Sequence, residues 1–186
     1  VYGYLLKGPW YDVGSIRRYL QATQEILSGR MTLDLGEQIQ EDKRIFIAGM
    51  SRKSKEAREA ILKKCTSSMI KLDAPVLLGK HCRIGNSVRI SSSCIGNYAE
   101  IRDNCSIENS IIMDNVIVDD STEISDSIVG TYCLINSNLQ EPTRIDSFSA
   151  IGDDVIVEAG SEIIASRIRP HSKTLKGRYV NEDPYN

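Results

Sequence analysis

Several features that mark other protein classes are missing or scarce in this sequence of 186 residues. No apolar run approaches the roughly 20 residues that span a bilayer, and no signal peptide opens the chain. The net charge of −2 offers no concentrated basic face, which excludes the usual footing for nucleic acid. Only two histidines occur, and no Cys-x-x-Cys spacing suggests a zinc site. We therefore expect a chain that binds neither nucleic acid nor membrane, in a reducing, cytoplasmic setting.

What the sequence has instead is an aliphatic residue at intervals of six, six and five. The first run consists of Leu78, Ile84, Ile90, Ile95, Ile101, Ile107, Ile112, Val118, Ile124, Val129 and Ile135. One full cycle takes 17 residues, a period that neither an α-helix nor a single strand has. Three short strands per cycle, joined by corners, describe a triangular prism. Its aliphatic side chains point inward and stack on those of the next coil, about 4.8 Å away.

A second inward position is predicted four residues after each aliphatic, where space is tight. It holds Cys82, Val88, Cys94, Ala99, Cys105, Val116, Thr122 and Cys133. Four of the five cysteines thus serve as compact hydrophobic residues. Cys82 and Cys133 share a face but lie about 14 Å apart, whereas a disulfide needs Cα atoms within roughly 7 Å. We expect neither a disulfide nor a metal site among them.

The pattern resumes after a break at Pro142, which is incompatible with a central strand. The resumed run is Ile145, Ile151, Val157 and Ile163, in steps of six. The sequence therefore predicts about five coils with one continuous core between Leu78 and Ile163. Residues that tolerate a left-handed backbone fit the corners. They are Asn86, Asn97, Asn104, Asn115, Asp153 and Asp154.

The repeat resembles the hexapeptide-repeat family, with "IGNSVR", "IGNYAE" and "IGDDVI" as good single matches. That resemblance implies a left-handed parallel β-helix. The handedness comes from the resemblance, because spacing alone cannot supply it. The family includes both acyltransferases and nucleotidyltransferases, so the repeat does not decide the function.

A second resemblance lies in "GPWYDVGSIRRYLQATQEILSG", residues 8–29, which is similar to the end of the catalytic domain of sugar-1-phosphate nucleotidyltransferases. There, a W-x-D-x-G segment leads into a helix. The matching positions here are Trp10, Asp12, Gly14, Tyr19, Leu20, Ala22 and Leu27. The local chemistry agrees, because Ser15 is a good N-cap and Gly29 a good stop. The predicted apolar face of this helix consists of Ile16, Tyr19, Leu20, Thr23, Ile26 and Leu27.

The second resemblance implies that Asp12 helps bind a Mg²⁺ ion that bridges the nucleotide and sugar phosphates. The metal offsets charge while a sugar 1-phosphate attacks the α-phosphate of a nucleoside triphosphate and pyrophosphate leaves. The alternative is that Asp12 only begins the turn before the helix. The Gly-rich loop and Thr-Arg-Leu segment of that family do not occur in these residues. Because the chain opens on "VYGYLL" without Met, we interpret it as a C-terminal part that is inactive alone.

The segments between and after these motifs have simpler interpretations. Residues 44–50 indicate a short buried strand, and residues 54–65 an amphipathic helix that caps the first coil, with a solvated basic face. A hexapeptide acyltransferase commonly uses a histidine as general base. His81 and His171 are the candidates here, but no supporting carboxylate can be identified from spacing, so we expect both to lie on the surface. The tail carries Pro184 and is expected to lie along the β-helix or fray.

The predicted fold is therefore mainly β, with four parts. These are the end of a catalytic domain (1–29), a connecting and capping segment (30–76), a left-handed β-helix (77–168) and a tail (169–186). Three functions stay open. They are the C-terminal region of a nucleotide-sugar pyrophosphorylase, an acetyl-CoA-dependent or bifunctional acyltransferase, and a structural assembly module. We expect a homo-oligomer held by β-helix faces, with Ser92, Asn109 and Ser127 as an uncharged ladder. Symmetry, sugar and nucleotide are left open.

Overall fold

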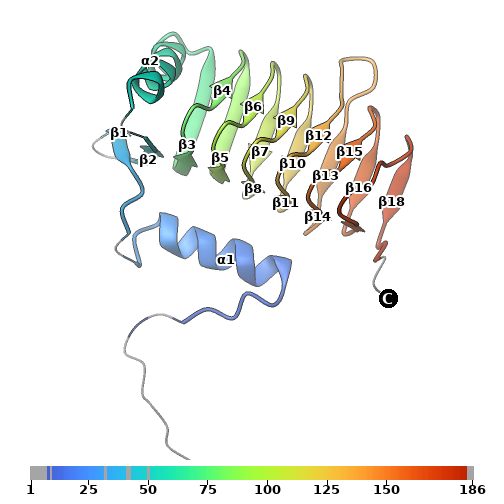
Figure 1. The fold of residues 1–186 in the computed structure, drawn as a ribbon. Coiled ribbons are helices and arrows are strands. Elements are labelled where there is room, and N and C mark those ends of the chain that lie inside the picture. Colours follow the sequence, from blue (N-terminus) through green and yellow to red (C-terminus); the bar gives the residue numbers. More distant parts are fainter. Residues whose placement is uncertain (1–7, 9, 32, 41–42, 50, 184–186) are drawn as a thin grey trace, which may run out of the picture.

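A computed structural model describes residues 8, 10–31, 33–40, 43–49 and 51–183. Figure 1 shows a long solenoid of short strands, with helix α2 (Arg52–Thr66) at its N-terminal end and helix α1 (Ile16–Leu27) running alongside. The predicted left-handed parallel β-helix is confirmed. Neither helix among the described residues is long and apolar enough to cross a membrane.

The strands form two sheets that wrap the three sides of the prism. The five-stranded sheet covers one side and consists of β4 (Arg83–Ile84), β6 (Glu100–Ile101), β9 (Ile117–Val118), β12 (Leu134–Ile135) and β15 (Ile156–Val157). The 13-stranded sheet covers the other two sides, because β5 (Val88–Ile95) bends around a corner and pairs with both β7 and β8. Its other strands are β1 (Glu37–Gln40), β2 (Lys43–Ile47), β3 (Ile70–Leu78), β7 (Ser106–Glu108), β8 (Ile111–Ile112), β10 (Glu123–Ser125), β11 (Ile128–Val129), β13 (Arg144–Asp146), β14 (Ala150–Ile151), β16 (Glu162–Ile164), β17 (Arg167–Ile168) and β18 (Arg178–Val180).

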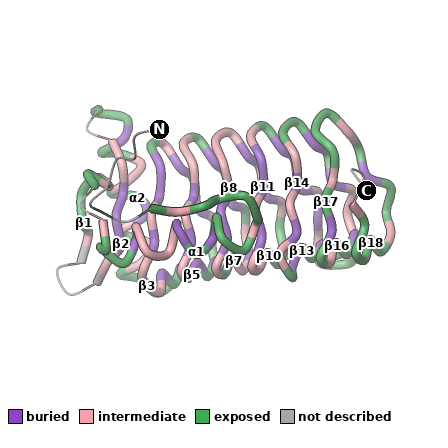
Figure 2. The backbone as a smooth tube through the Cα atoms, turned by 90° about the horizontal axis from the view of Figure 1, so that it is seen from below, coloured by how far each residue is buried: buried purple, intermediate pink, exposed green. Residues whose placement is uncertain are grey.

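The predicted inward register is confirmed for all fifteen aliphatics, since every one of them is buried. Ile95 pairs with Ile112, and Ile112's equivalent one coil later is Val129, as the 17-residue step requires. The next step is longer, because Val129 pairs with Ile151 across the insertion that carries Pro142. The core nevertheless stays a single cluster through this interruption. Figure 2 shows buried positions recurring coil after coil along the whole prism.

The parallel ladders extend beyond the predicted range of 77–168 at both ends. At the start, Leu72 already pairs with Ile90, and β2 pairs in parallel with β3. At the end, β18 pairs in parallel with β16 and places Tyr179 over Ile163. The tail thus forms a further coil up to Val180, while Pro184 lies outside the described residues. A coil at the end of a solenoid packs against another coil on one side only, so it tolerates more polar residues. These polar residues interrupt the aliphatic repeat, and the sequence pattern therefore did not predict this coil.

The second inward position was assigned wrongly in the five-residue parts. Cys94 is half-buried and points outward, whereas Ser93 is fully buried. In a segment of five residues, the second inward side chain comes three residues after the inward aliphatic. The prediction assumed a spacing of four residues, which holds only for segments of six. A ladder of buried serines results: Ser93, Ser110, Ser127, Ser149 and Ser166. The Ser93 hydroxyl accepts a hydrogen bond from the Ser110 N–H at 3.0 Å, which satisfies a buried polar group.

The corners combine left-handed residues with close backbone approach. Asn104, Asn115 and Asp154 have φ values of 59°, 58° and 54°, as predicted. The other three predicted corner residues, Asn86, Asn97 and Asp153, do not have a positive φ. Glycine occurs where the backbones of neighbouring coils approach closely. A Cβ atom on Gly79 would clash, because it would lie 2.5 Å from the carbonyl carbon of Gly96 in the next coil.

The capping helix is observed as predicted, and three of the four cysteines expected to point inward, Cys82, Cys105 and Cys133, are buried. Helix α2 packs against β3 and β4 and buries Ile61 in the core, and the Lys64 ammonium donates to the Ile84 carbonyl at 2.6 Å. All five cysteines are free, so no disulfide forms. The predicted strand at 44–50 is observed as β2, although Met50 lies outside the described residues.

Candidate functional site

Asp12 shapes the turn that leads into α1. One carboxylate oxygen accepts the Gly14 N–H at 3.0 Å, and the other pairs with the Arg18 guanidinium. The helix begins as predicted, with the Ser15 hydroxyl accepting the Arg18 N–H at 3.3 Å. The local role considered for Asp12, beginning this turn, is therefore present. The preceding Trp10 is 74% exposed.

The described residues supply only part of a magnesium site. Mg²⁺ commonly takes one or two carboxylates together with phosphate oxygens and waters. Asp12 is exposed and provides one such carboxylate. No group of three or more Asp, Glu, His or Cys side chains within the described ranges could hold a metal ion. Asp12 as a Mg²⁺ ligand accordingly stays a prediction for a larger enzyme that brings phosphates and further ligands to it.

Helix α1 is fixed to the β-helix at both of its ends. Near its N-terminus, the Arg17 guanidinium lies 4.0 Å from the centre of the Phe148 ring. Near its C-terminus, the Gln24 side chain donates to the Ser92 carbonyl, and the Arg44 guanidinium donates to the Leu27 carbonyl. The segment that carries Asp12 is therefore held against the solenoid by contacts far apart along the chain.

The buried side chains of α1 are Leu20, Ala22 and Leu27. Tyr19, which we expected on the apolar face, is instead 37% exposed. A hydrogen bond also joins the segment before α1 to the helix, because the Tyr11 phenol donates to the Glu25 carboxylate at 2.8 Å. This hydrogen bond raises the pKa of Tyr11 and lowers that of Glu25.

The helix lies along the outside of the prism (Figures 1 and 2). The strands place a row of apolar residues on this side. We call it the covered row, and its members are Phe46, Leu77, Cys94, Ile111, Ile128 and Ala150. Ile111 is only 7% exposed although its neighbour Ile112 is the inward residue. Because α1 packs against β3 and β5 along this side, it shields part of this outer apolar surface from water: Phe46 and Ile111 are buried, and the other four residues are half-buried. Ser92, expected in a free uncharged ladder, is tied to α1, and Ser127 is buried, so that ladder is not available for assembly.

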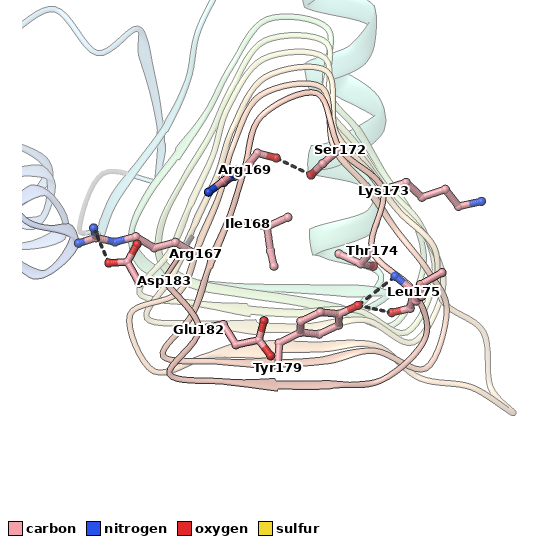
Figure 3. A pocket seen from close by; sticks show the side chains of 10 residues that line it. All are labelled: Arg167, Ile168, Arg169, Ser172, Lys173, Thr174, Leu175, Tyr179, Glu182 and Asp183. Atoms are coloured by element: carbon pink, nitrogen blue, oxygen red, sulfur yellow. Dashed lines mark hydrogen bonds and ion pairs between the residues drawn. The ribbon is translucent and has the colours of Figure 1, made fainter. Parts of the chain in front are cut away.

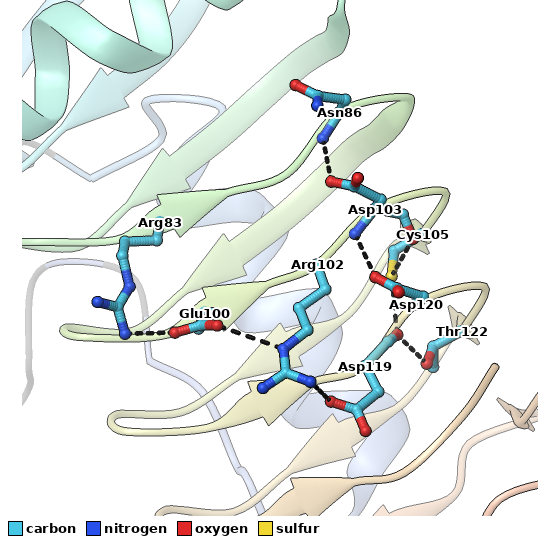
Figure 4. Close-up of polar contacts among 9 residues, drawn as sticks. All are labelled: Arg83, Asn86, Glu100, Arg102, Asp103, Cys105, Asp119, Asp120 and Thr122. Atoms are coloured by element: carbon cyan, nitrogen blue, oxygen red, sulfur yellow. Dashed lines mark hydrogen bonds and ion pairs between the residues drawn. The ribbon is translucent and has the colours of Figure 1, made fainter.

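The five-stranded sheet carries a different outer row. Its first members are charged, with Arg83 paired with Glu100 (Figure 4). In the neighbouring outer row, Arg102 lies 3.3 Å from Glu100 and 2.7 Å from Asp119. Burial raises the pKa of Asp119, while the charge of Asp119 raises the pKa of Arg102. The outer row that begins with Arg83 then becomes apolar, with Ile117, Leu134 and Ile156 in register on successive coils. We call these three residues the open row.

The two histidines lie on one corner ridge of the prism. His81 stacks on Tyr98 with ring centres 4.9 Å apart, and its Nε2 lies 3.3 Å from the Ser54 hydroxyl. The Nδ1 of His171 lies 3.1 Å from a carboxylate oxygen of Asp154, one coil away. Asp154 and His171 are 17 residues apart, which is the regular coil step, so the repeat itself contained the signal for this carboxylate. Both members of the His171 pair are exposed, as expected for a surface role.

Two hollows lie at the ends of the solenoid. Figure 3 shows the C-terminal end, where the Tyr179 ring points into the last coil and its hydroxyl donates to the Leu175 carbonyl at 2.7 Å. The hollow around it measures about 540 Å³. A groove of about 920 Å³ lies beside the N-terminal corner, between Asp34–Glu37 and the coil edge at Gly79 and Gly96. Neither hollow brings together residues that the sequence marked as catalytic.

Comparison with known proteins places the repeat region. The family model described as the EIF2B subunit epsilon LbH domain matches residues 58–163, more than half of the chain. The chain belongs to this family. The matched range starts inside α2 and ends at the last aliphatic of the predicted register. The EIF2B epsilon LbH match thus covers the β-helix and leaves α1 and Asp12 outside it.

Solved structures share the fold at low identity. Perosamine N-acetyltransferase from Caulobacter crescentus, solved with CoA and GDP-perosamine, is 14% identical, with a TM-score of 0.42 over 72% of this chain and 65% of that one. A hexapeptide transferase family protein from Anaplasma phagocytophilum is 13% identical, with a TM-score of 0.35 over 57% and 66%. The alignments thus span slightly less than two thirds of each neighbour.

Proposed function

We propose that this chain is the C-terminal region of a sugar-1-phosphate nucleotidyltransferase, whose β-helix holds copies of the enzyme together. The observation that carries the proposal is the docking of α1. The segment that resembles the end of the catalytic domain is bound to the β-helix through Arg17, Gln24 and Leu27. An acyltransferase has no use for such a segment. The family match supports an assembly role, since its name is that of a subunit.

In the proposed enzyme the chain positions Asp12. The Ser15 cap and the Arg18 ion pair fix the carboxylate at the start of α1. The docking of α1 then fixes its place relative to the β-helix. When bound, Mg²⁺ would offset the negative charge that develops on the phosphates. Sugar 1-phosphate and nucleoside triphosphate are the proposed substrates, and an NDP-sugar and pyrophosphate are the products.

The test measures pyrophosphate release by the intact protein with Mg²⁺, common nucleoside triphosphates and sugar 1-phosphates. We expect release by the intact protein, none by the 186-residue chain alone, and a loss of at least about tenfold in the Asp12→Asn variant. Asp34→Asn is the matched control, because Asp34 makes the same turn contact, accepting the Gly36 N–H at 3.0 Å. An intact protein that releases no pyrophosphate with any pair contradicts the proposal.

Acyl transfer is the second candidate, favoured by the His171–Asp154 pair. A carboxylate that orients a histidine is typical of a general base. Here the pair is exposed on a corner, with side chains 76% and 67% accessible. We expect no acetyl-CoA turnover. Turnover that is lost in His171→Ala or His81→Ala would reverse the ranking of the two functions.

A further inference from the structure

The open row lacks the cover that its counterpart has. Ile117, Leu134 and Ile156 lie on the outer side of the five-stranded sheet; Ile117 and Leu134 are half-buried, and Ile156 is 38% exposed. The described helices lie elsewhere, with α1 along the covered row and α2 at the N-terminal end. Leu139 in the neighbouring insertion is 74% exposed, and Tyr132 at the adjoining corner 66%. Aliphatic and aromatic side chains clustered on one face mark an interaction surface.

The sequence of residues along this face is self-complementary. The outer row reads Glu100, Ile117, Leu134, Ile156 and Lys173, one residue per coil. Leu134 stands in the middle, an isoleucine lies one coil away on either side, and opposite charges lie two coils away. A second copy turned end for end about Leu134 would place Ile117 against Ile156 and Glu100 against Lys173. Two-fold pairing of one surface with itself has this property.

We propose that the five-stranded face binds a second copy of the chain, with the two solenoids antiparallel and the two-fold axis at Leu134. This inference deepens the assembly role in the proposed function and does not depend on nucleotidyl transfer. The axis runs along the strands, so the corner that carries Tyr132 meets its own counterpart. The exposed Tyr132 ring and Leu139 would both lie at the level of the axis.

Charge separates this arrangement from a parallel one. Turned end for end, the face brings one like-charged pair together, Asp119 with Glu158 of the second copy. Each of these carboxylates already has a cation of its own, Arg102 at 2.7 Å and Lys173 at 2.6 Å. A parallel two-fold pair about the same row would instead set Glu100 against Glu100 and Lys173 against Lys173 of the second copy. Like charges placed together disfavour an interface.

Cross-linking between single-cysteine positions tests the geometry. Ile117→Cys and Ile156→Cys are prepared separately, mixed, and treated with a short bis-maleimide. The antiparallel pair predicts strong cross-linking in the mixture and little in either variant alone, because the two positions are about 10 Å apart along one solenoid. Leu134→Cys should cross-link to itself. The parent chain is the control, since its own cysteines are buried or half-buried.

Light scattering completes the test. We expect the mass of two chains for the parent at micromolar concentration and of one chain for Leu134→Glu with an unchanged circular dichroism spectrum. A parent mass of one chain would overturn the inference. So would self-cross-linking of Ile117→Cys and Ile156→Cys alone, which a parallel assembly predicts. Neither measurement involves turnover, so its outcome is separate from that of the pyrophosphate assay.

Discussion

The covered row and the open row arise from the same feature of the repeat, an aliphatic residue placed directly before an inward one. Ile111 precedes Ile112, and Ile117 precedes Val118. Ile111 lies beside α1 and is 7% exposed, whereas Ile117 is half-buried and Ile156, in the same row as Ile117, is 38% exposed. A β-helix buries its inner side chains against its own coils, but an outer aliphatic needs another element. Among the residues that the structure describes, one helix, α1, lies along one of these two apolar rows.

The difference in cover between the two rows indicates a different role for each side of the prism. The covered row holds the segment with Asp12 in place, while the open row is free to hold a second copy. The third side, with outer residues such as Arg89, Glu123 and Arg144, is charged and needs no cover. Substitutions in the interior, the covered row and the open row should therefore have effects of different size and kind.

The largest effect is expected in the interior. Replacing Ile124, which is 1% exposed between two coils, with Asp buries a charge without a partner. We expect loss of the cooperative fold, a destabilisation of more than about 4 kcal/mol, measured by circular dichroism during thermal unfolding. The control is Ser125→Asp, one residue along and half-buried on the outside. If Ile124→Asp melts like the parent, the inward register is wrong.

A matched pair of outer substitutions compares the two rows directly. Ile111→Asp should cost about 2–3 kcal/mol, because it places a carboxylate under α1. Ile117→Asp should cost less than about 1 kcal/mol within one chain, yet abolish association. Urea unfolding measures the first effect and light scattering the second. Equal stability losses in the two variants would show that α1 does not distinguish the rows.

Alkaline pH should weaken the interior through its thiols. Burial raises the pKa of Cys82 to about 12 and that of Cys133 to about 11. These values lie above the ordinary thiol pKa of about 8.5, so the folded state favours the protonated form. The resulting stability is complete below about pH 8.5 and is lost as the pH rises through 11. We expect the urea midpoint to fall between pH 8.5 and 10.5.

The control for that pH dependence removes one thiol without removing its packing. Cys133→Val should show a shallower decline over the same pH interval, because Val116 already occupies the equivalent inward position one coil earlier. If the urea midpoint of Cys133→Val falls as steeply with pH as that of the parent, ionisation of Cys133 does not contribute to the loss of stability.

The interior could be predicted from the sequence because stacking at a fixed coil spacing imposes a strict period on the aliphatics. The start of α1 was equally accessible, since Ser15 and Gly29 signal its limits locally. Cys94 was misplaced because one missing residue changes the phase of a five-residue part. The final coil was overlooked because Tyr179 replaces an aliphatic there.

The open row carried a signal that the inward period concealed. Ile117–Val118, Leu134–Ile135 and Ile156–Val157 are consecutive aliphatics at coil spacing, and only the second of each pair is needed inside. The docking of α1 had no such signal. It depends on contacts such as Gln24 with Ser92, 68 residues apart, which no local pattern encodes.

The smallest expected effect concerns the hold of the covered row on α1. Arg17→Ala removes the cation–π contact with Phe148, worth about 0.5–1 kcal/mol at an exposed site. This loss should leave the β-helix intact but speed amide hydrogen exchange within α1 by roughly two- to fivefold, because the helix leaves the surface more often. Exchange in α2 provides the internal reference. Arg18→Ala is the matched control, since Arg18 pairs with Asp12 rather than with the β-helix. Exchange that accelerates equally in both variants would mean that α1 frays on its own and is not held by the Arg17 contact.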